Sequence, residues 1–228
     1  MTRMFLAPNG KRMRTWNIFT GCNFDCYYCW ARKLVTTRLA HLEKYNSVGF
    51  IPTFHPKELN VTFKPNEFVF VSSLGDIRFA SWPELKEILA IIQKYPQTQF
   101  LLQTKDPSMF LNGRTWESNI YQGATIETNR EITVSKAKQP IKRYHAFAEN
   151  SHPHKFLSIE PIMDFDIEVF LSWIKDIKPE IVEIGADNYR SCLPEPSWDK
   201  VEALLKGLRE ICPTIIEKQG LERLKREA

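Results

Sequence analysis

The sequence lacks the long apolar segment that a membrane span or a secretory signal requires. No apolar run in the 228 residues approaches the roughly 18 residues of a membrane span. The N-terminal segment MTRMFLAPNGKRMR is polar and basic, without an apolar stretch. Gly/Ser-rich linkers, low-complexity tracts and close repeats are also absent. We therefore expect one domain over residues 1–228, no membrane partner and a cytoplasmic location.

Cysteine is scarce, with five residues in the whole chain, and a strong excess of one charge is missing. The formal net charge is +4 at pH 7, which permits a nucleic-acid or acidic substrate without requiring one. In a reducing compartment, clustered cysteines are more often metal ligands or catalytic groups than disulfides.

Short apolar runs alternate with helical stretches along the chain. We expect helices over residues 82–95, 165–177 and 197–211, and strands over residues 15–20, 67–73, 99–104, 119–126, 155–159, 180–185 and 214–218. This alternation is typical of a parallel sheet. It predicts an α/β fold, a partial (βα)6 TIM-like barrel with room for a seventh strand, because a full barrel takes about 250 residues. A doubly wound sheet is the alternative.

Polar residues follow each predicted strand. The first strand runs into a cysteine loop, and the later ones end in SSLGD, TKD, ETN, EP, GADN and KQG. In parallel α/β folds ligands bind at the edge where strands end. The sequence therefore predicts a site at this edge.

The cysteine loop TGCNFDCYYCW, residues 20–30, places Cys22, Cys26 and Cys29 in the pattern C-x3-C-x2-C. Structural zinc takes four protein ligands, and the fourth would have to be remote: His41, His55, Cys192 or Cys212. Iron–sulfur clusters prefer thiolates. Three thiolates would hold three irons of a [4Fe–4S] cluster and leave the fourth iron open.

The cysteine spacing directly after the first strand, with Tyr28 before the third cysteine, resembles the signature of the radical SAM superfamily. TWNIFTGC, FVFVSSLGD, FLLQTK, GATIETN, FLSIEP and EKQG resemble landmarks of one of its branches, found in phage, bacterial and archaeal genomes. The resemblance implies a [4Fe–4S] cluster on Cys22, Cys26 and Cys29, with S-adenosylmethionine (SAM) on the open iron. Reductive cleavage would give methionine and a 5′-deoxyadenosyl radical that takes hydrogen from a substrate. A one-electron reductant such as flavodoxin or ferredoxin is implied as a partner.

The resemblance also assigns cofactor-binding roles to strand ends. Tyr28 resembles the aromatic residue beside the adenine, and Asp76 resembles the acidic residue that receives the SAM ammonium. Alternatively, Asp76 only caps a turn and Lys105 is a solvated surface residue. Lys218 is one possible partner of Glu160. The full set expected to bind the cofactor is Tyr28, Ser72, Ser73, Gly75, Asp76, Lys105, Thr125, Glu127, Ser158 and Glu160.

Two features bear on the substrate. Cys192, in a loop after the sixth strand, is the candidate catalytic residue as a hydrogen-atom donor, with an ordinary loop cysteine as the alternative. The basic stretch 136–143 is either a nucleic-acid face or a solvated helix. Nucleic acid is the first expected substrate. The alternatives are modification of a small molecule or peptide, and a non-catalytic zinc- or iron–sulfur-binding module.

Overall fold

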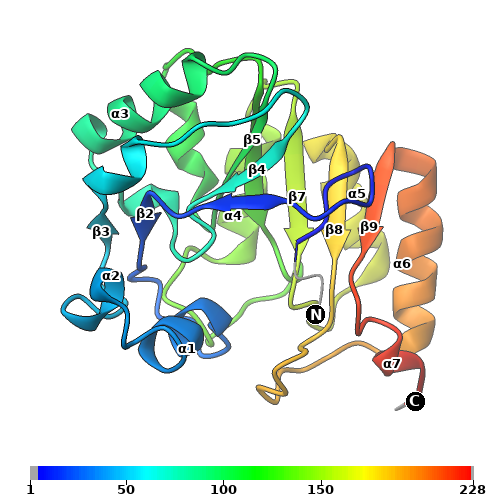
Figure 1. Cartoon of the computed structure of the whole chain (residues 1–228). Coiled ribbons are helices and arrows are strands. Elements are labelled where there is room, and N and C mark those ends of the chain that lie inside the picture. Colours follow the sequence, from blue (N-terminus) through cyan, green and yellow to red (C-terminus); the bar gives the residue numbers. More distant parts are fainter. Residues whose placement is uncertain (1–4, 227–228) are drawn as a thin grey trace.

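A seven-stranded sheet in the order β1-β4-β5-β6-β7-β8-β9 frames the computed structural model, which describes residues 5–226. All neighbouring strands are parallel, and the sheet curls into a half-barrel (Figure 1). The strands are β1 Arg14–Trp16, β4 Phe68–Val71, β5 Gln99–Thr104, β6 Ile120–Thr125, β7 Lys155–Ile159, β8 Ile181–Ile184 and β9 Thr214–Glu217. The expected partial TIM-like α/β barrel is confirmed, including the seventh strand. The predicted domain also includes residues 1–4 and 227–228, which lie outside the described residues.

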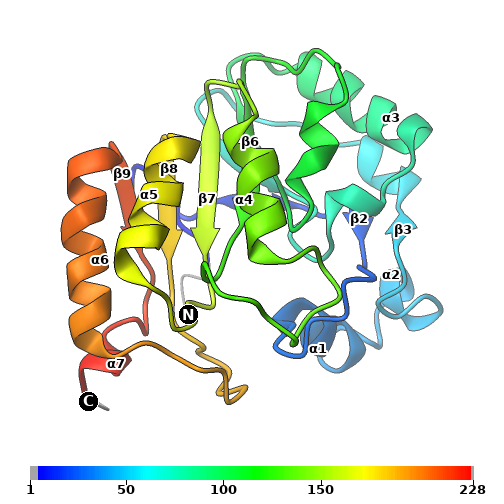
Figure 2. The same ribbon diagram turned by 180° about the vertical axis from the view of Figure 1, so that it is seen from behind.

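Helices connect the strands and cover the outer face of the sheet. Figures 1 and 2 show α3 to α6 on this face, while α1 and α2 lie towards the edge where the strands end. The helices are α1 Trp30–Thr36, α2 Glu43–Asn46, α3 Trp82–Gln93, α4 Pro140–Ala148, α5 Ile167–Ile177, α6 Trp198–Ile211 and α7 Arg223–Arg226, with 3-10 helices η1 Pro56–Leu59, η2 Ile77–Phe79 and η3 Pro107–Leu111. Within residues 5–226, no helix has the length and apolar character needed to cross a membrane.

Local sequence explains where these helices begin and which face they bury. The helix α3 starts at a capping box in which Ser81 and Glu84 satisfy each other's backbone N–H groups. Its buried residues Leu85, Ile88 and Ile92 recur at helical spacing. The expected helices at 82–95, 165–177 and 197–211 correspond to α3, α5 and α6.

The expected first strand, residues 15–20, is instead two short strands in two sheets. Its first part is β1, which pairs with β4, whereas β2 (Phe19–Thr20) pairs antiparallel with β3 (Thr53–Phe54). The chain leaves the main sheet at Asn17, whose Oδ1 accepts hydrogen bonds from Ser73 Oγ at 3.1 Å and from the Leu74 N–H at 3.0 Å. This side chain thereby joins the start of the cysteine loop to the end of β4.

The curled sheet also has a core on its inner face. Phe68, Leu101, Phe156 and other inward residues form one buried cluster with Ala7 and Met13 from the N-terminal segment. Figure 1 shows this segment crossing the face of the sheet opposite the helices. The inner face of the half-barrel is therefore filled by side chains of the strands and of the N-terminal segment.

Candidate functional site

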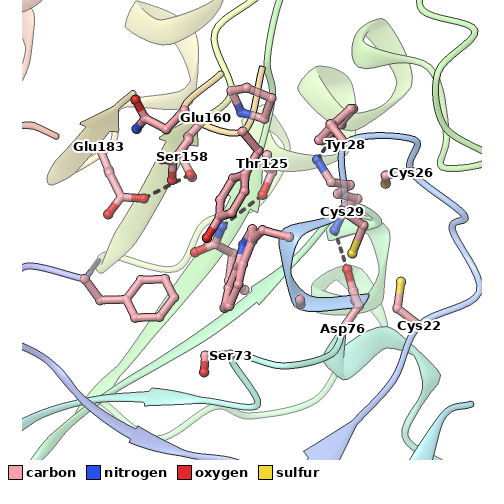
Figure 3. Close-up of a pocket in the computed structure, with 18 of the residues that line it drawn as sticks. Cys22, Cys26, Tyr28, Cys29, Ser73, Asp76, Thr125, Ser158, Glu160 and Glu183 are labelled. Carbon is pink, nitrogen blue, oxygen red and sulfur yellow. Dashed lines mark hydrogen bonds between the residues drawn. The ribbon is translucent and has the colours of Figure 1, made fainter. Parts of the chain in front are cut away.

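A cavity of about 410 Å³ lies where the strands end. In Figure 3, Cys22, Cys26 and Cys29 lie at one side of it, and Ser158, Glu160 and Glu183 lie at the other. The three cysteines line this cavity together with most of the expected cofactor-binding residues: Tyr28, Ser73, Gly75, Asp76, Lys105, Thr125, Ser158 and Glu160. Residues from the cysteine loop and from four strand ends thus meet in one place.

The cysteine loop is fixed by residues 134–136, a segment more than a hundred positions further along the chain. The Tyr27 N–H donates to the Val134 carbonyl at 2.9 Å, and the Lys136 N–H donates to the Phe24 carbonyl at 2.6 Å. Cys26 Sγ and Ser135 Oγ lie 3.1 Å apart, within hydrogen-bond distance. These contacts hold the loop as a rigid part of the site, and nothing in the sequence pattern indicated them.

The cysteine thiols occupy a partly buried, largely apolar environment. Burial raises the pKa of the Cys22 and Cys29 thiols. Two backbone groups already point at sulfur, because the Phe24 N–H donates to Cys22 Sγ at 3.4 Å and the Arg32 N–H donates to Cys29 Sγ at 3.3 Å. A buried thiol becomes a thiolate when a nearby cation compensates the negative charge. Over residues 5–226, no three His, Cys, Asp or Glu side chains converge on a site for a single metal ion.

Two glycines allow the cysteine loop to approach the end of β4. Gly21 and Gly75 form a parallel bridge, with the Asp76 N–H donating to the Gly21 carbonyl at 3.2 Å. A Cβ at Gly75 would lie 2.8 Å from that carbonyl oxygen, and Gly21 has a φ of +84°, which favours glycine. The lack of a side chain at Gly75 thus lets the cysteine loop lie against the end of β4, a role that the resemblance did not suggest.

Asp76 both caps a turn and lines the cavity. Its Oδ1 accepts hydrogen bonds from the Arg78 N–H at 2.9 Å and from Thr104 Oγ1 at 2.7 Å, and its Oδ2 accepts from the Lys105 N–H at 2.9 Å. Burial raises the pKa of Asp76 despite these donors. The carboxylate is held rigidly, and the lone pairs that remain on Oδ2 are available to a ligand.

Glu127 does not line the cavity but lies behind the residues that do. Its position therefore does not support the direct contact with a cofactor that the resemblance implies. The side chain is completely buried and forms an ion pair with Lys105 and another with Arg143, whose Nη1 lies 2.7 Å from Oε2. Tyr28 donates its hydroxyl hydrogen to Glu127 Oε1 at 2.5 Å. Although burial alone would raise the pKa of Glu127, Arg143 and Lys105 lower it to about 2. Glu127 therefore positions Tyr28 and Lys105.

Neither expectation for the basic stretch 136–143 holds for Arg143, whose side chain is completely buried. Its Nη1 also donates to the Thr125 carbonyl at 2.6 Å, and its Nε donates to the Lys138 carbonyl at 2.8 Å. Lys138 forms an ion pair with Asp106 at 2.8 Å. Lys136 pairs with Asp25 in the same way, and Lys136, Lys138 and Lys142 are all exposed, so only Arg143 of the four basic side chains is buried. The missed signal is the spacing of Pro140, Arg143 and Phe147, which places the arginine on the buried face of α4.

At the far side of the cavity an ammonium lies between two carboxylates. Lys218 Nζ is 2.5 Å from Glu160 Oε2, as anticipated, and 3.5 Å from Glu183 Oε1. Glu183 also accepts a hydrogen bond from Ser158 Oγ at 3.2 Å. Burial raises the pKa of Glu183 to about 7. Sequence analysis missed Glu183, although a carboxylate inside the apolar run of β8 was a usable signal.

Three further residues lie away from the cavity. Ser72 is buried with a φ of +60°, and its hydroxyl has no hydrogen-bond partner among the described residues. Cys192 is exposed and does not line the cavity, so its position gives no support to a hydrogen-donor role. Cys212 is buried in the core away from the cysteine loop, with its Sγ 3.3 Å from the Thr214 carbonyl oxygen. All five cysteines are free thiols.

Comparison with known proteins places the chain in a family and a fold. The model of a family described as "Protein of unknown function (DUF5131)" matches residues 12–185. No curated protein matches the chain. Two solved structures of spore photoproduct lyase each align with a TM-score of 0.59 and 11% identity, covering 89% of this chain and 75% of the other. One is a cysteine-to-alanine mutant with dinucleoside spore photoproduct, and the other is a tyrosine-to-phenylalanine mutant. At this identity the likeness shows the fold alone.

Proposed function

The chain belongs to the DUF5131 family, and we propose that it is a radical SAM enzyme. One observation carries the proposal: the three cysteines of a C-x3-C-x2-C loop line the same cavity as the strand ends of a partial parallel barrel. When bound, a [4Fe–4S] cluster would supply one electron to SAM, which would split into methionine and a 5′-deoxyadenosyl radical. The radical would then take a hydrogen atom from a substrate.

The donor set fits such a cluster. Cys22, Cys26 and Cys29 would each hold one iron of the cluster through a thiolate. Burial disfavours thiolates at Cys22 and Cys29 unless a cation is present. The N–H groups that already point at two sulfurs are of the kind that tunes the reduction potential of iron–sulfur clusters.

The residues beside the cysteines would bind SAM. Asp76 presents a buried carboxylate to the SAM ammonium. Lys105, held by Glu127, would meet the SAM carboxylate. Tyr28 is fixed against Glu127 and keeps its ring at the cavity. Beyond these three residues, Ser73, Gly75, Thr125, Ser158 and Glu160 extend the lining along the strand ends.

Nucleic acid is the first candidate substrate, followed by two alternatives. A nucleic-acid substrate rests on the net charge of +4 and on the exposed lysines of the stretch 136–143, of which Lys136 and Lys138 also pair with carboxylates of the chain. Modification of a small molecule or a peptide is the second candidate, and a non-catalytic zinc- or iron–sulfur-binding module is the third. A one-electron reductant such as flavodoxin or ferredoxin would be the partner, in a reducing cytoplasm compatible with five free thiols.

The test is anaerobic reconstitution followed by incubation with SAM and dithionite. We expect about four irons per chain, formation of 5′-deoxyadenosine, and loss of both in Cys26→Ala. Cys212→Ala, at a buried cysteine outside the cavity, is the matched control and should keep both. Zinc in place of iron, or a cluster that leaves SAM intact, would contradict the proposal.

A further inference from the structure

The cavity extends past the end of β7, the last strand end that we assign to the cofactor, and Glu160 lies where the two parts of the cavity meet. In the sheet, β8 and β9 lie furthest from β1, which leads towards the cysteine loop. Glu183 of β8 lines this end of the cavity together with Glu160 (Figure 3). Lys218, which follows β9, also lines the cavity and lies 2.5 Å from Glu160 Oε2. The proposed binding of cluster and SAM assigns no role to Glu183 or Lys218.

We call Glu160, Glu183 and Lys218 the ion triad. Keeping these charged groups out of water costs the fold free energy. The side chain of Lys218 is 7% exposed and that of Glu183 is 5% exposed. Removing paired charges from water costs several kilocalories per mole, and apolar replacements are often neutral or stabilising. Stability alone therefore does not account for the triad. Buried ionisable groups that converge in a cavity are typical of functional sites.

The charges of the lining disfavour a phosphate in the cavity. Among residues 5–226, the cations that line it are Lys105 and Lys218, and carboxylates pair with both. Four carboxylate side chains share the lining: Asp76, Glu160, Glu183 and Asp187. At the end formed by Glu160, Glu183 and Lys218, one ammonium faces two carboxylates, so a phosphate placed there would meet an excess of like charge. An uncharged ligand avoids this repulsion.

Aromatic rings lie beside the triad. Phe5 and Phe70 line the cavity with their ring centroids 5.0 Å apart, and Lys218 Nζ lies 5.2 Å from the centre of the Phe5 ring. Aromatic faces stack on flat heterocycles, and neighbouring carboxyl and ammonium groups can satisfy donors and acceptors on the edge of such a ring. The Asn188 amide, which donates to the Gln219 carbonyl at 3.0 Å, adds a fixed polar group to this end.

We propose that the end of the cavity formed by Glu183, Lys218 and Glu160 is the substrate subsite, and that it binds a flat, uncharged heterocycle through edge hydrogen bonds and aromatic stacking. The proposal deepens the proposed function and rests on it for the meaning of "substrate". It assigns roles to Glu183 and Lys218, which face the cavity from β8 and β9. A phosphate attached to the ligand would point out of the cavity.

The subsite should depend on pH because Glu183 changes charge near neutrality. Burial raises its pKa to about 7, and the groups that face it are Lys218 beyond β9 and Glu160 and Ser158 from the end of β7. Below this pKa the carboxyl is protonated and donates a hydrogen bond to a ring acceptor. Above it the donor is lost and the subsite gains negative charge, so affinity for an uncharged acceptor falls.

The test is calorimetric titration of the full chain with uridine and uridine 5′-monophosphate, at pH values on either side of 7. We expect uridine to bind with millimolar or better affinity, more tightly on the acidic side, and the monophosphate to bind no more tightly. Glu183→Leu should weaken uridine binding about tenfold. Glu183→Gln keeps a hydrogen-bonding side chain and should retain binding without the pH dependence. Circular dichroism of each variant reports folding.

The matched control is Glu180→Gln, just before the start of β8, where the carboxylate accepts a hydrogen bond from Tyr121 outside the cavity. It should leave uridine binding unchanged. The proposal is overturned if uridine does not bind, if the monophosphate binds about tenfold more tightly, or if folded Glu183→Leu and Glu183→Gln both bind as the native chain does. The titrations are made with and without iron, so failure of the cluster proposal would appear separately, in iron content and 5′-deoxyadenosine formation.

Discussion

Replacement of Arg143 by methionine should strongly destabilise the protein, because it leaves the buried carboxylate of Glu127 short of one cation. Glu127 is completely buried, and its pKa falls from 4.5 to about 2. That shift corresponds to about 3 kcal/mol at neutral pH, since each tenfold change in a dissociation constant is worth roughly 1.4 kcal/mol. Breaking a buried ion pair from one side typically costs about 3–5 kcal/mol. The first figure is the combined effect of burial, Arg143, Lys105 and Tyr28 on Glu127, so the second sets the expected loss at about 3–5 kcal/mol.

The measurement is urea denaturation of the metal-free chain at pH 7, which gives the free energy of unfolding. Arg209→Met is the matched control, because its ion pair with Glu217 at 3.1 Å is exposed and should cost less than about 1 kcal/mol. The stabilisation from Glu127 is present above its ordinary pKa of 4.5 and is lost as the pH falls towards about 2. The difference between native and Arg143→Met should therefore shrink in acid. Equal losses for the two variants would refute the reasoning.

Other consequences concern the cofactor side of the cavity. Gly75→Ala should impair iron retention, because its Cβ would lie 2.8 Å from the Gly21 carbonyl oxygen. Iron analysis after reconstitution measures this, and full iron content would show that the cysteine loop can shift without losing the iron. Asp76→Asn should weaken SAM binding by about tenfold or more, as expected for loss of a charged hydrogen-bond partner; equilibrium dialysis measures it, and unchanged affinity would remove Asp76 from the SAM site. Cys192→Ser should leave iron content and 5′-deoxyadenosine formation unchanged, because Cys192 is exposed outside the cavity lining; loss of either would give the loop a role that its position does not indicate.

The sheet and much of the cavity lining follow from local sequence. Apolar runs ending in polar residues predicted seven parallel strands, and the polar ends do meet at one edge. The prediction of a single first strand over residues 15–20 was wrong. This stretch was interpreted as one apolar run, but the chain turns at Asn17 and enters a second sheet. That turn depends on Ser73 and Leu74, and contacts across such distances leave no local pattern.

The ion networks were harder to anticipate, since a charged residue in a sequence is exposed by default. Lys105 belongs to one of these networks rather than to the surface. Arg143 and Glu183 each interrupt a buried face, one on α4 and one on β8. Such interruptions mark candidate buried charges, but their partners lie on other elements. Only the folded chain shows that Glu127 completes one network and Lys218 the other.

The attachment of the cysteine loop to residues 134–136 also constrains the order of events during synthesis. A ribosome delivers the three cysteines early, whereas Val134 and Ser135, which hold Tyr27 and Cys26, emerge only after more than half of the chain has been made. A nascent chain folds from its N-terminal end as it grows, yet its first hundred residues cannot form this loop as described. Cluster insertion would therefore follow translation of β6 and the segment after it. N-terminal fragments that end before residue 134 should take up little iron.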